Sequence, residues 1–358
     1  MTKLLPAMVA GLALCGALPS CRRAEQVGGG EAGPGAAVNA PAQAASSFPQ
    51  VYERVAPAVV SVNAARVAAA PRAISDFFSG AAGGGRPVVQ SMSSGSGFFI
   101  SADGTVLTNN HVVGDANQVS VTLRDGRSLP ARVVGRDPAT DLAVLRVSGR
   151  GFPHVTFSSA ANPRVGEAVI AIGNPFGLGT TATHGIVSAY GRDIGSPYVD
   201  FVQLDAPINQ GNSGGPTFNE RGEVVGVNTA IFSPSGGSVG IGFAIPAATA
   251  SAVARELVSS GRVTRGFIGA SLVDVPPEAA GTPTGGAGVA ALVLGGPAQR
   301  AGLRPGDIVT AVGGREVDGA ADVIRSVVAA QARDVLRFTV MRNGRSLSVE
   351  VPVQRRPS

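Results

Sequence analysis

Short apolar runs, separated by glycine, asparagine and aspartate, fill the middle of the chain from Gly95 to Ile245. Runs of this kind between turn residues are typical of antiparallel strands, and their spacing favours sheets closed into barrels. No alternation of strand and helix recurs here, which argues against a doubly wound α/β fold. The clearest predicted strands are Gly97–Ile100, Val119–Leu123, Leu142–Val147, Val169–Gly173, Val199–Leu204 and Val224–Val227.

Helical periodicity flanks this region on both sides. The apolar positions of residues 48–55 recur with the period of an amphipathic helix, and Val59–Val62 after them predicts a strand. A second helical period runs from Ala250 to Val258 and ends at Gly261, a residue type that often terminates helices. We expect this second helix to connect the barrels with a last domain.

The last domain, at about 264–354, has a pattern of its own. Apolar alternation predicts strands at Val335–Met341 and Ser346–Val353, joined by an Asn-Gly turn, and a helical stretch at Ala320–Gln331. The predicted fold class is therefore all-β, with two antiparallel barrels followed by a small α+β domain.

Three segments are poor in large apolar groups. Residues 22–47 read as a flexible linker, and Ala64–Ser94 as a long mobile loop in which Phe77 and Phe78 could dock. The proline- and glycine-rich stretch Pro276–Ala287 is expected to be disordered.

The N-terminus, residues 1–21, resembles a bacterial export signal. Lys3 supplies the positive start, and the apolar run Leu4–Leu18 is short for a membrane-spanning helix, which needs about 20 residues. The run ends in Leu-Pro-Ser-Cys, similar to a lipoprotein processing site, so Cys21 is a candidate for lipidation. Ordinary cleavage nearby and an uncleaved anchor remain as alternatives. The segment predicts a location in the periplasm or cell envelope, with a membrane anchor if Cys21 is lipidated.

Composition narrows the chemistry. Apolar residues make up 44% of the 358 positions, enough for the cores of two or three domains. The net charge of +5 comes without a basic run or stacking aromatic residues, which argues against nucleic-acid binding. Both cysteines, Cys15 and Cys21, lie in the signal, so the mature chain has no internal disulfide, cysteine nucleophile or thiolate metal site. We expect no metal and no cofactor.

A serine between glycines, in the stretch Gly211–Pro216, is the strongest candidate for a nucleophile. Glycine lets the backbone approach a substrate closely, and a tight turn can direct successive N–H groups at one point, as stabilisation of an oxyanion requires. The alternative is a glycine-rich β-turn with an incidental serine.

A serine nucleophile needs a base. Lys3, the sole lysine, is in the signal, which leaves His111, His154 and His184. His111 follows an apolar strand and would lie at its end beside a loop. We interpret His154 and His184 as structural or surface residues.

The base in turn needs a carboxylate to orient it. Asp141 directly precedes the apolar run that begins at Leu142, where a carboxylate must be paired or hydrogen-bonded. Asp137 precedes a proline and is interpreted as a turn residue. The order His, Asp, Ser is one of the known triad orders and the one found on double β-barrels.

With these motifs in collinear order, the chain resembles the HtrA (DegP/DegQ/DegS-type) family of trypsin-like serine endopeptidases with one PDZ domain. The matching stretches are Gly95–Phe98, Leu107–Val113, Asp137–Val144, Ala171–Gly177, Gly185–Ser188, Ile208–Pro216 and Gly240–Pro246. The resemblance covers about 48–354. It implies a protease domain at 48–260, made of two chymotrypsin-like antiparallel β-barrels, and a PDZ domain at 264–354.

The resemblance also implies roles for individual residues. His111 would be the general base, Asp141 its orienting carboxylate and Ser213 the nucleophile. Backbone N–H groups would form the oxyanion hole, and an apolar pocket would favour a small aliphatic residue before the cut bond. The implied oxyanion residues are Gly211, Asn212 and Ser213, and those of the pocket are Ile208, Ala230 and Ile231. Leu204 and Pro207 stand where the family usually has threonine and alanine.

The C-terminal part resembles a PDZ domain through two motifs, Arg265–Gly269 and Ala301–Asp307. The first implies a loop that captures peptide C-termini through the N–H groups of Gly266, Phe267, Ile268 and Gly269, with peptide pairing along a strand near Ser271–Val273.

The function that follows is ATP-independent proteolysis of misfolded or unfolded proteins in the bacterial cell envelope, in protein quality control and stress response. A chaperone or peptide sensor with minor proteolysis remains open, whereas metal-dependent hydrolysis lacks a His-Glu-x-x-His motif. The resemblance implies a homotrimer, with Phe48 and Tyr52 as candidate contacts.

Overall fold

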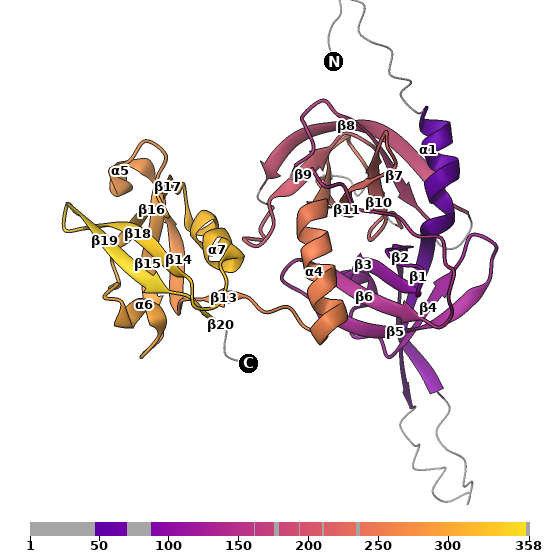
Figure 1. Ribbon diagram of the computed structural model, residues 1–358, viewed down its shortest axis with the longest axis horizontal. Coiled ribbons are helices and arrows are strands. Elements are labelled where there is room, and N and C mark those ends of the chain that lie inside the picture. Colours follow the sequence, from indigo (N-terminus) through magenta and orange to yellow (C-terminus); the bar gives the residue numbers. More distant parts are fainter. Residues whose placement is uncertain are drawn as a thin grey trace, which may run out of the picture. The chain divides into compact units, whose positions relative to one another are not determined.

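The computed structural model describes residues 47–69, 87–160, 162–174, 179–192, 194–209, 211–233 and 237–355. Two closed, six-stranded antiparallel barrels come first, and a smaller sheet domain follows them (Figure 1). The predicted all-β fold class is thereby confirmed. The predicted signal, the predicted linker as far as residue 46, Cys21, Phe77 and Phe78 lie outside the described residues.

The first barrel contains the predicted strands at 59–62, 97–100, 119–123 and 142–147, together with a strand at 128–137 that was not predicted. Its strands follow the order β1-β2-β3-β6-β5-β4, and its interior holds fully buried aliphatic and aromatic side chains such as Phe99, Val106 and Leu145. The strands are β1 (Val59–Ala69), β2 (Pro87–Phe99), β3 (Thr105–Asn109), β4 (Gln118–Thr122), β5 (Ser128–Asp137) and β6 (Leu142–Val147).

The second barrel repeats the architecture, with the strand order β10-β11-β12-β9-β8-β7. Its strands are β7 (Ala168–Gly173), β8 (Thr181–Arg192), β9 (Phe201–Leu204), β10 (Pro216–Asn219), β11 (Val224–Ile231) and β12 (Gly242–Pro246). One hydrophobic cluster joins the barrels, since Phe98 and Leu107 of the first pack with Ile172 and Phe218 of the second. The two barrels therefore share one buried hydrophobic core.

Two helices pack against this shared hydrophobic core. The predicted helix at 48–55 is α1 (Phe48–Val55), which buries Val51 and Val55 and leads through η1 (Ala56–Ala58) into β1. The second is α4 (Ala247–Ser260), and Gly261 ends it in the left-handed conformation, φ 72°, as its sequence position predicts. The short α3 (Asn110–Val113) follows β3. None of the described helices is long and apolar enough to cross a membrane.

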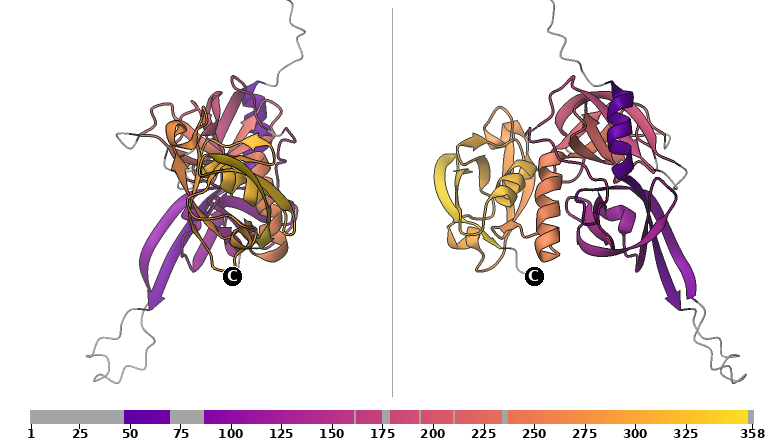
Figure 2. Two further views of the ribbon diagram at one scale, coloured as in Figure 1. Left: turned by 90° about the vertical axis from the view of Figure 1, so that its left-hand side faces the viewer. Right: turned by 45° about the vertical axis from the view of Figure 1, so that its right-hand side comes forward.

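The prediction of a loop from Ala64 to Ser94 is wrong at both ends. Strands β1 and β2 stay paired as far as Ala69↔Pro87, with a shift of register between Arg66 and Val67 (Figure 2). Beyond Ala65, the last residue of β1 that pairs with β4, they form a two-stranded ribbon. Backbone hydrogen bonds hold a ladder whatever the size of its side chains, so scarce apolar residues do not exclude a strand. The Asn117 side chain makes two hydrogen bonds with Val67: its Oδ1 accepts from the Val67 N–H at 3.0 Å, and its Nδ2 donates to the Val67 carbonyl at 2.7 Å.

The C-terminal domain is a sheet in the order β14-β15-β16-β18-β19, with β17 beside β16 and a separate pair of β13 and β20. Its core contains the fully buried Phe338, Val323 and Val351. The elements are β13 (Gly266–Phe267), β14 (Ala270–Val275), α5 (Pro277–Ala280), β15 (Gly286–Leu292), α6 (Pro297–Arg300), β16 (Ile308–Val312), β17 (Arg315–Glu316), α7 (Ala320–Ala329), β18 (Val335–Arg342), β19 (Arg345–Pro352) and β20 (Gln354–Arg355).

The expected disorder of Pro276–Ala287 is also wrong. This stretch holds helix α5, whose Ala280 is buried, and a turn in which Thr282 and Gly285 exchange hydrogen bonds before β15 begins. Proline at the first helical position and glycine after the last one are compatible with a short helix. The prolines and glycines of this stretch therefore indicate where the helix begins and ends, and they do not indicate disorder.

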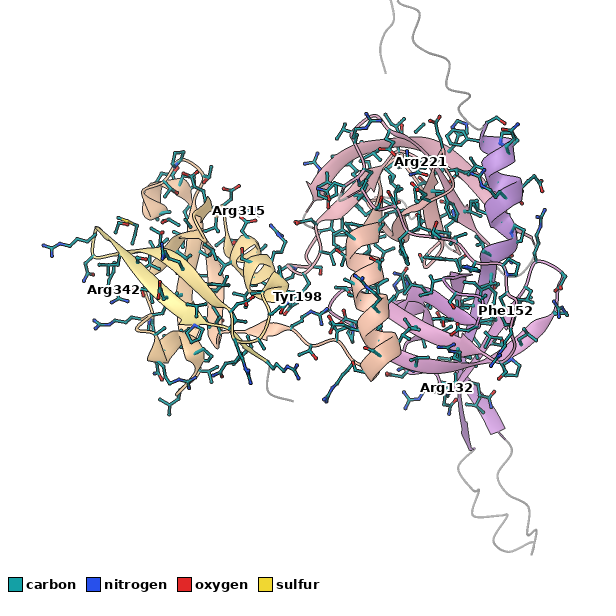
Figure 3. The ribbon with its side chains drawn as sticks, viewed as in Figure 1. Arg132, Phe152, Tyr198, Arg221, Arg315 and Arg342 are labelled. Carbon is teal, nitrogen blue, oxygen red and sulfur yellow. The ribbon has the colours of Figure 1, made fainter. Side chains whose placement is uncertain are left out.

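An ion pair with a buried carboxylate joins Arg342, the last residue of β18, to Asp307, the residue before β16. Arg342, labelled in Figure 3, donates from Nε to Asp307 Oδ1 at 2.6 Å and from a terminal nitrogen to Oδ2 at 2.7 Å. Burial acts to raise the pKa of Asp307, but hydrogen bonds from Arg342 and from the Arg304 N–H outweigh it and leave the pKa lowered.

Candidate active site

His111 lies just after the end of strand β3 of the first barrel. All five residues of β3 are buried, and α3 begins directly after it, so the histidine lies exposed at the strand end. The buried Asn109 donates from Nδ2 to the Asp141 carbonyl at 2.8 Å, and the Asn110 N–H donates to the same oxygen at 3.0 Å. These bonds fix the β5–β6 turn against the residue that precedes His111.

Asp141 is the last residue of that turn and adopts φ 56°, a left-handed conformation that aspartate tolerates better than most residues. Its carboxylate accepts hydrogen bonds from the His111 backbone N–H at 2.9 Å and from Thr229 Oγ1 at 2.7 Å, and it lies 2.6 Å from His111 Nδ1. A carboxylate only accepts, so Nδ1 carries the proton and the Nε2 lone pair is left for another partner. This is the tautomer that a general base requires.

The turn from Gly211 to Gly215 carries Ser213, and its backbone bonds can be accounted for one by one. The Asn212 N–H donates to the Asn209 carbonyl, the Gly214 N–H to the Asn228 carbonyl, and the Gly215 N–H to the Asn212 carbonyl, at 2.8 to 3.0 Å. Gly211 and Gly214 have φ 100° and 83°, which glycine adopts without strain.

Two N–H groups of this turn are left over. Within the described residues, those of Gly211 and Ser213 donate to no protein acceptor. Two free N–H donors with one residue between them are an arrangement that can hold an oxyanion. The Asn212 N–H, which the sequence analysis assigned to the same hole, is engaged by Asn209.

His111, Ser213 and Gly211 face one surface hollow of about 580 Å³, which Asn63, Met92, Ser93 and Ser94 also line. In the part of the chain that is described, no hydrogen bond joins His111 to Ser213. Catalytic hydrogen bonds are often long in the absence of substrate, so this distance does not exclude a base at His111 and a nucleophile at Ser213. His111 and Ser213, which lie far apart in the sequence, thus meet at one opening.

The residues expected to line a specificity pocket lie on the second barrel. Ile208 is almost fully buried and packs with Ala171, Ala206 and Ile231. Ala230 and Ile231 are the partly buried end of β11, opposite Phe243 and Gly242 of β12. The side chains around Ile208 are apolar and leave little space, because a Cβ on Gly242 would lie 2.8 Å from Ile208 Cγ1.

The other two histidines lie apart from these groups. His184, on β8, stacks on Phe48 of α1 with ring centroids 5.6 Å apart. His154 lies exposed in a loop, with Nδ1 3.3 Å from the Phe152 carbonyl.

Asp137 is not the simple turn residue that the sequence suggested. It ends β5, is almost fully buried, accepts the Thr140 hydroxyl and forms a two-point ion pair with the Arg265 guanidinium. The following proline marked the turn, but the partner is 128 residues away and no local pattern indicates it.

Sequence reasoning also missed Thr229, which donates to the Asp141 carboxylate. It belongs to β11, 88 residues after Asp141 in the sequence. Thr229 lies just beyond the predicted strand Val224–Val227, and a threonine there carries no signal for this contact. Among the described residues, no group of three histidine, cysteine, aspartate or glutamate side chains could hold a metal ion.

The loop between β13 and β14 has the features of a carboxylate-binding loop. The carbonyl of Ile268 accepts from the Ala298 N–H and that of Gly269 from the Val293 N–H, each at 2.8 Å. In a trans peptide the N–H points away from the preceding carbonyl, so the Gly269 N–H faces away from Ala298. Within the described residues, the N–H groups of Ile268 and Gly269 have no acceptor. Beside them is a hollow of about 210 Å³ with mainly apolar walls, including Phe267, Leu272 and Ile324.

Comparison with known families assigns the two barrels and the C-terminal sheet domain to two different families. Residues 95–227 match the trypsin-like peptidase domain, and residues 266–353 match the PDZ domain. A relative from Rhizobium meliloti, named probable periplasmic serine endoprotease DegP-like, is 49% identical over 270 residues, which are 74% of this chain and 54% of that protein. A relative of the same name from Chlamydia trachomatis is 43% identical over 279 residues, 76% of this chain and 56% of that protein. The chain thus spans about half the length of the curated relatives it matches.

Solved structures match over a larger share of their length. The HtrA-type protease AlgW with a decapeptide has a TM-score of 0.73 and 38% identity, over 87% of this chain and 99% of that one. The serine endoprotease from Yersinia pestis has a TM-score of 0.64 and 35% identity, over 87% and 98%.

Proposed function

The chain belongs to the HtrA family of trypsin-like serine proteases with a PDZ domain, and on this premise we propose that it is a serine endopeptidase whose triad is His111, Asp141 and Ser213. The observation that carries the proposal is the Asp141 carboxylate, which accepts from His111 twice and from Thr229. Such a carboxylate fixes both the ring orientation and the tautomer of the base.

In the proposed reaction, Ser213 Oγ attacks the peptide carbonyl while His111 Nε2 takes the hydroxyl proton. Asp141 stabilises the imidazolium that forms, and the N–H groups of Gly211 and Ser213 bind the oxyanion. The imidazolium then protonates the leaving amine, and a water molecule, activated by the same base, hydrolyses the acyl-enzyme. Water is the sole co-reactant, so the reaction needs no ATP.

The proposed specificity is for small aliphatic residues before the cut bond. The support for this is the apolar packing around Ile208, together with Ala230 and Ile231 at the end of β11. A tight apolar site favours an aliphatic side chain, since burial of a charged one without a partner is costly.

We further propose that unfolded or misfolded polypeptides of the cell envelope are the substrates, in protein quality control and stress response, and that the PDZ domain binds peptide C-termini. The unpartnered N–H groups of Ile268 and Gly269 beside an apolar hollow support the second part. The relatives' names, which say periplasmic, and the N-terminal signal support the location.

A lipid at Cys21 and a homotrimer through Phe48 and Tyr52 are part of the same proposal. Phe48 and Tyr52 are half-buried and line a mainly apolar surface hollow with Ile170 and Ala182, which fits a subunit contact. Intact mass of the purified N-terminus tests the lipid, and light scattering of wild type against Phe48→Ser tests the trimer; a monomeric wild type would contradict it.

A serine-reactive phosphonate with valine at the first position, followed by mass-spectrometric mapping, tests the proposed activity. We expect the label on Ser213 in wild type and none in His111→Ala, and loss of casein cleavage in Ser213→Ala. His154→Ala is the matched control and should label normally. Cleavage of casein by Ser213→Ala at the wild-type rate would refute the proposal.

A further inference from the structure

Ser96 is a fully buried residue of β2 in the first barrel, yet its polar atoms contact the catalytic turn of the second. Its N–H donates to the Ser213 carbonyl at 2.8 Å, and its hydroxyl donates to the Gly211 carbonyl at 2.5 Å. The hydroxyl also accepts from the Asn174 N–H at 2.8 Å. One residue thus binds the carbonyls on both sides of Asn212.

These two bonds act together with the internal bonds of the turn. In a planar trans peptide the C=O and N–H point in opposite directions, so fixing both ends fixes the peptide plane. The Gly211–Asn212 peptide is held by the Ser96 hydroxyl at its carbonyl and by Asn209 at its N–H. The Ser213–Gly214 peptide is held by the Ser96 N–H and by Asn228.

The close fit of the turn on β2 shows how little room there is for another arrangement. A Cβ on Gly214 would lie 2.2 Å from the Ser96 carbonyl oxygen, and one on Gly215 would lie 3.2 Å from Ser96 Cβ. Gly211 itself, at φ 100°, has no side chain to restrict its rotation, so its conformation depends on bonds to its backbone. The hydrogen bond to the Gly211 carbonyl is the one that the Ser96 hydroxyl donates.

We propose that Ser96 is a positioning residue for the oxyanion hole: its hydroxyl holds the Gly211 carbonyl inward, so that the free N–H groups of Gly211 and Ser213 face the substrate carbonyl. This inference rests on the proposed serine peptidase activity. It assigns to the first barrel a direct part in shaping a hole that the second barrel's turn carries.

The test is Ser96→Ala, which removes the hydroxyl and keeps the Ser96 N–H. We expect kcat to fall about 10- to 100-fold with KM within about threefold, since removal of a whole oxyanion donor costs about 10²–10³ in kcat. A peptide aldehyde with valine at its end, whose adduct carries an oxyanion, should lose affinity in proportion to kcat. The corresponding peptide alcohol, which forms no oxyanion, should bind as it does to wild type.

Ser61→Ala is the matched control. Ser61 is a fully buried serine directly opposite Ser96 on β1, and within the described residues its hydroxyl has no partner, so its loss should change neither kcat nor aldehyde binding. Equal kcat in Ser96→Ala and wild type, or equal loss of aldehyde and alcohol affinity, would overturn the proposal. If Ser96→Ala does not fold, Ser96→Cys, with its weak donor, decides by the same aldehyde-to-alcohol ratio. Wild type that neither cleaves casein nor labels at Ser213 would instead refute the proposed function.

Discussion

Asp141→Asn is the most direct test of the candidate triad, because it changes the charge and one hydrogen-bonding atom and almost no volume. The wild-type carboxylate accepts from the His111 N–H at 2.9 Å on Oδ1, and on Oδ2 it meets His111 Nδ1 at 2.6 Å and Thr229 Oγ1 at 2.7 Å. An asparagine side chain offers one acceptor oxygen and one NH₂ group, so it cannot satisfy both sides.

Each orientation of the amide has a cost. With the NH₂ toward Nδ1, the imidazole must accept there and carry its proton on Nε2, where it cannot serve as a base. With the NH₂ toward the backbone N–H of His111, two donors face each other, which costs about 1–3 kcal/mol, or roughly 5- to 150-fold in population. The second orientation also replaces a charge-assisted bond to the imidazolium by a weaker neutral one, at about 1 kcal/mol or more.

Together these terms, about 2–4 kcal/mol, predict a loss in kcat of roughly 30- to 900-fold, which is smaller than the factor of about 10⁴ for the same change in a chymotrypsin-type triad. The assay is steady-state cleavage of a peptide with valine before the cut bond, with thermal unfolding as a check on the fold. Asp103→Asn, on the β2–β3 turn of the same barrel, is the control and should keep its kcat. If Asp141→Asn keeps more than a tenth of the wild-type kcat with an unchanged KM, the assigned role of Asp141 is refuted.

Three further predictions concern other parts of the molecule. Thr229→Val removes the hydroxyl bond to Asp141 and should lower kcat about tenfold, whereas Thr229→Ser should restore it; equal rates in the two variants would contradict this. The lowered pKa of Asp307 lies below its unfolded value of about 3.9, so its contribution to stability is present above that pH and lost as the pH falls through the folded value. Calorimetry should therefore show the C-terminal domain's unfolding temperature falling on acidification, more steeply in wild type than in Arg342→Met; parallel curves would argue against the pair. Phe218→Ala empties a fully buried site in the shared core and should cost about 3–5 kcal/mol in urea unfolding, and a loss below 1 kcal/mol would contradict its central position.

Much of this fold could be predicted because the relevant signals are local. The run Leu142–Val147 is β6 to the residue, and Gly261 ends α4 as a left-handed glycine should. The same holds for His111, whose place at the end of a buried strand followed from the apolar run before it. Periodicity and turn chemistry depend on neighbours in the sequence, and there the predictions were confirmed.

What could not be predicted depends on contacts between distant segments. The Thr229 hydroxyl and the Ser96 hydroxyl find their partners 88 and 115 residues away, and serine or threonine in a strand looks the same whether or not such a partner exists. The β1–β2 ribbon was missed for a related reason, since backbone pairing leaves no mark on side-chain composition. Likewise, Asp137 appeared to serve only a turn until Arg265 was seen beside it.

The left-handed backbone of Asp141 constrains which amino acids this position can tolerate, apart from any chemistry. Most L-residues pay about 1–2 kcal/mol there, while asparagine and glycine pay little. A library of all substitutions at this position, sorted by the amount of folded protein, should therefore keep asparagine and glycine and deplete valine and isoleucine, even under conditions where proteolysis gives no advantage. Selection for folding alone would then favour a short polar residue at the position where the proposed chemistry needs a carboxylate.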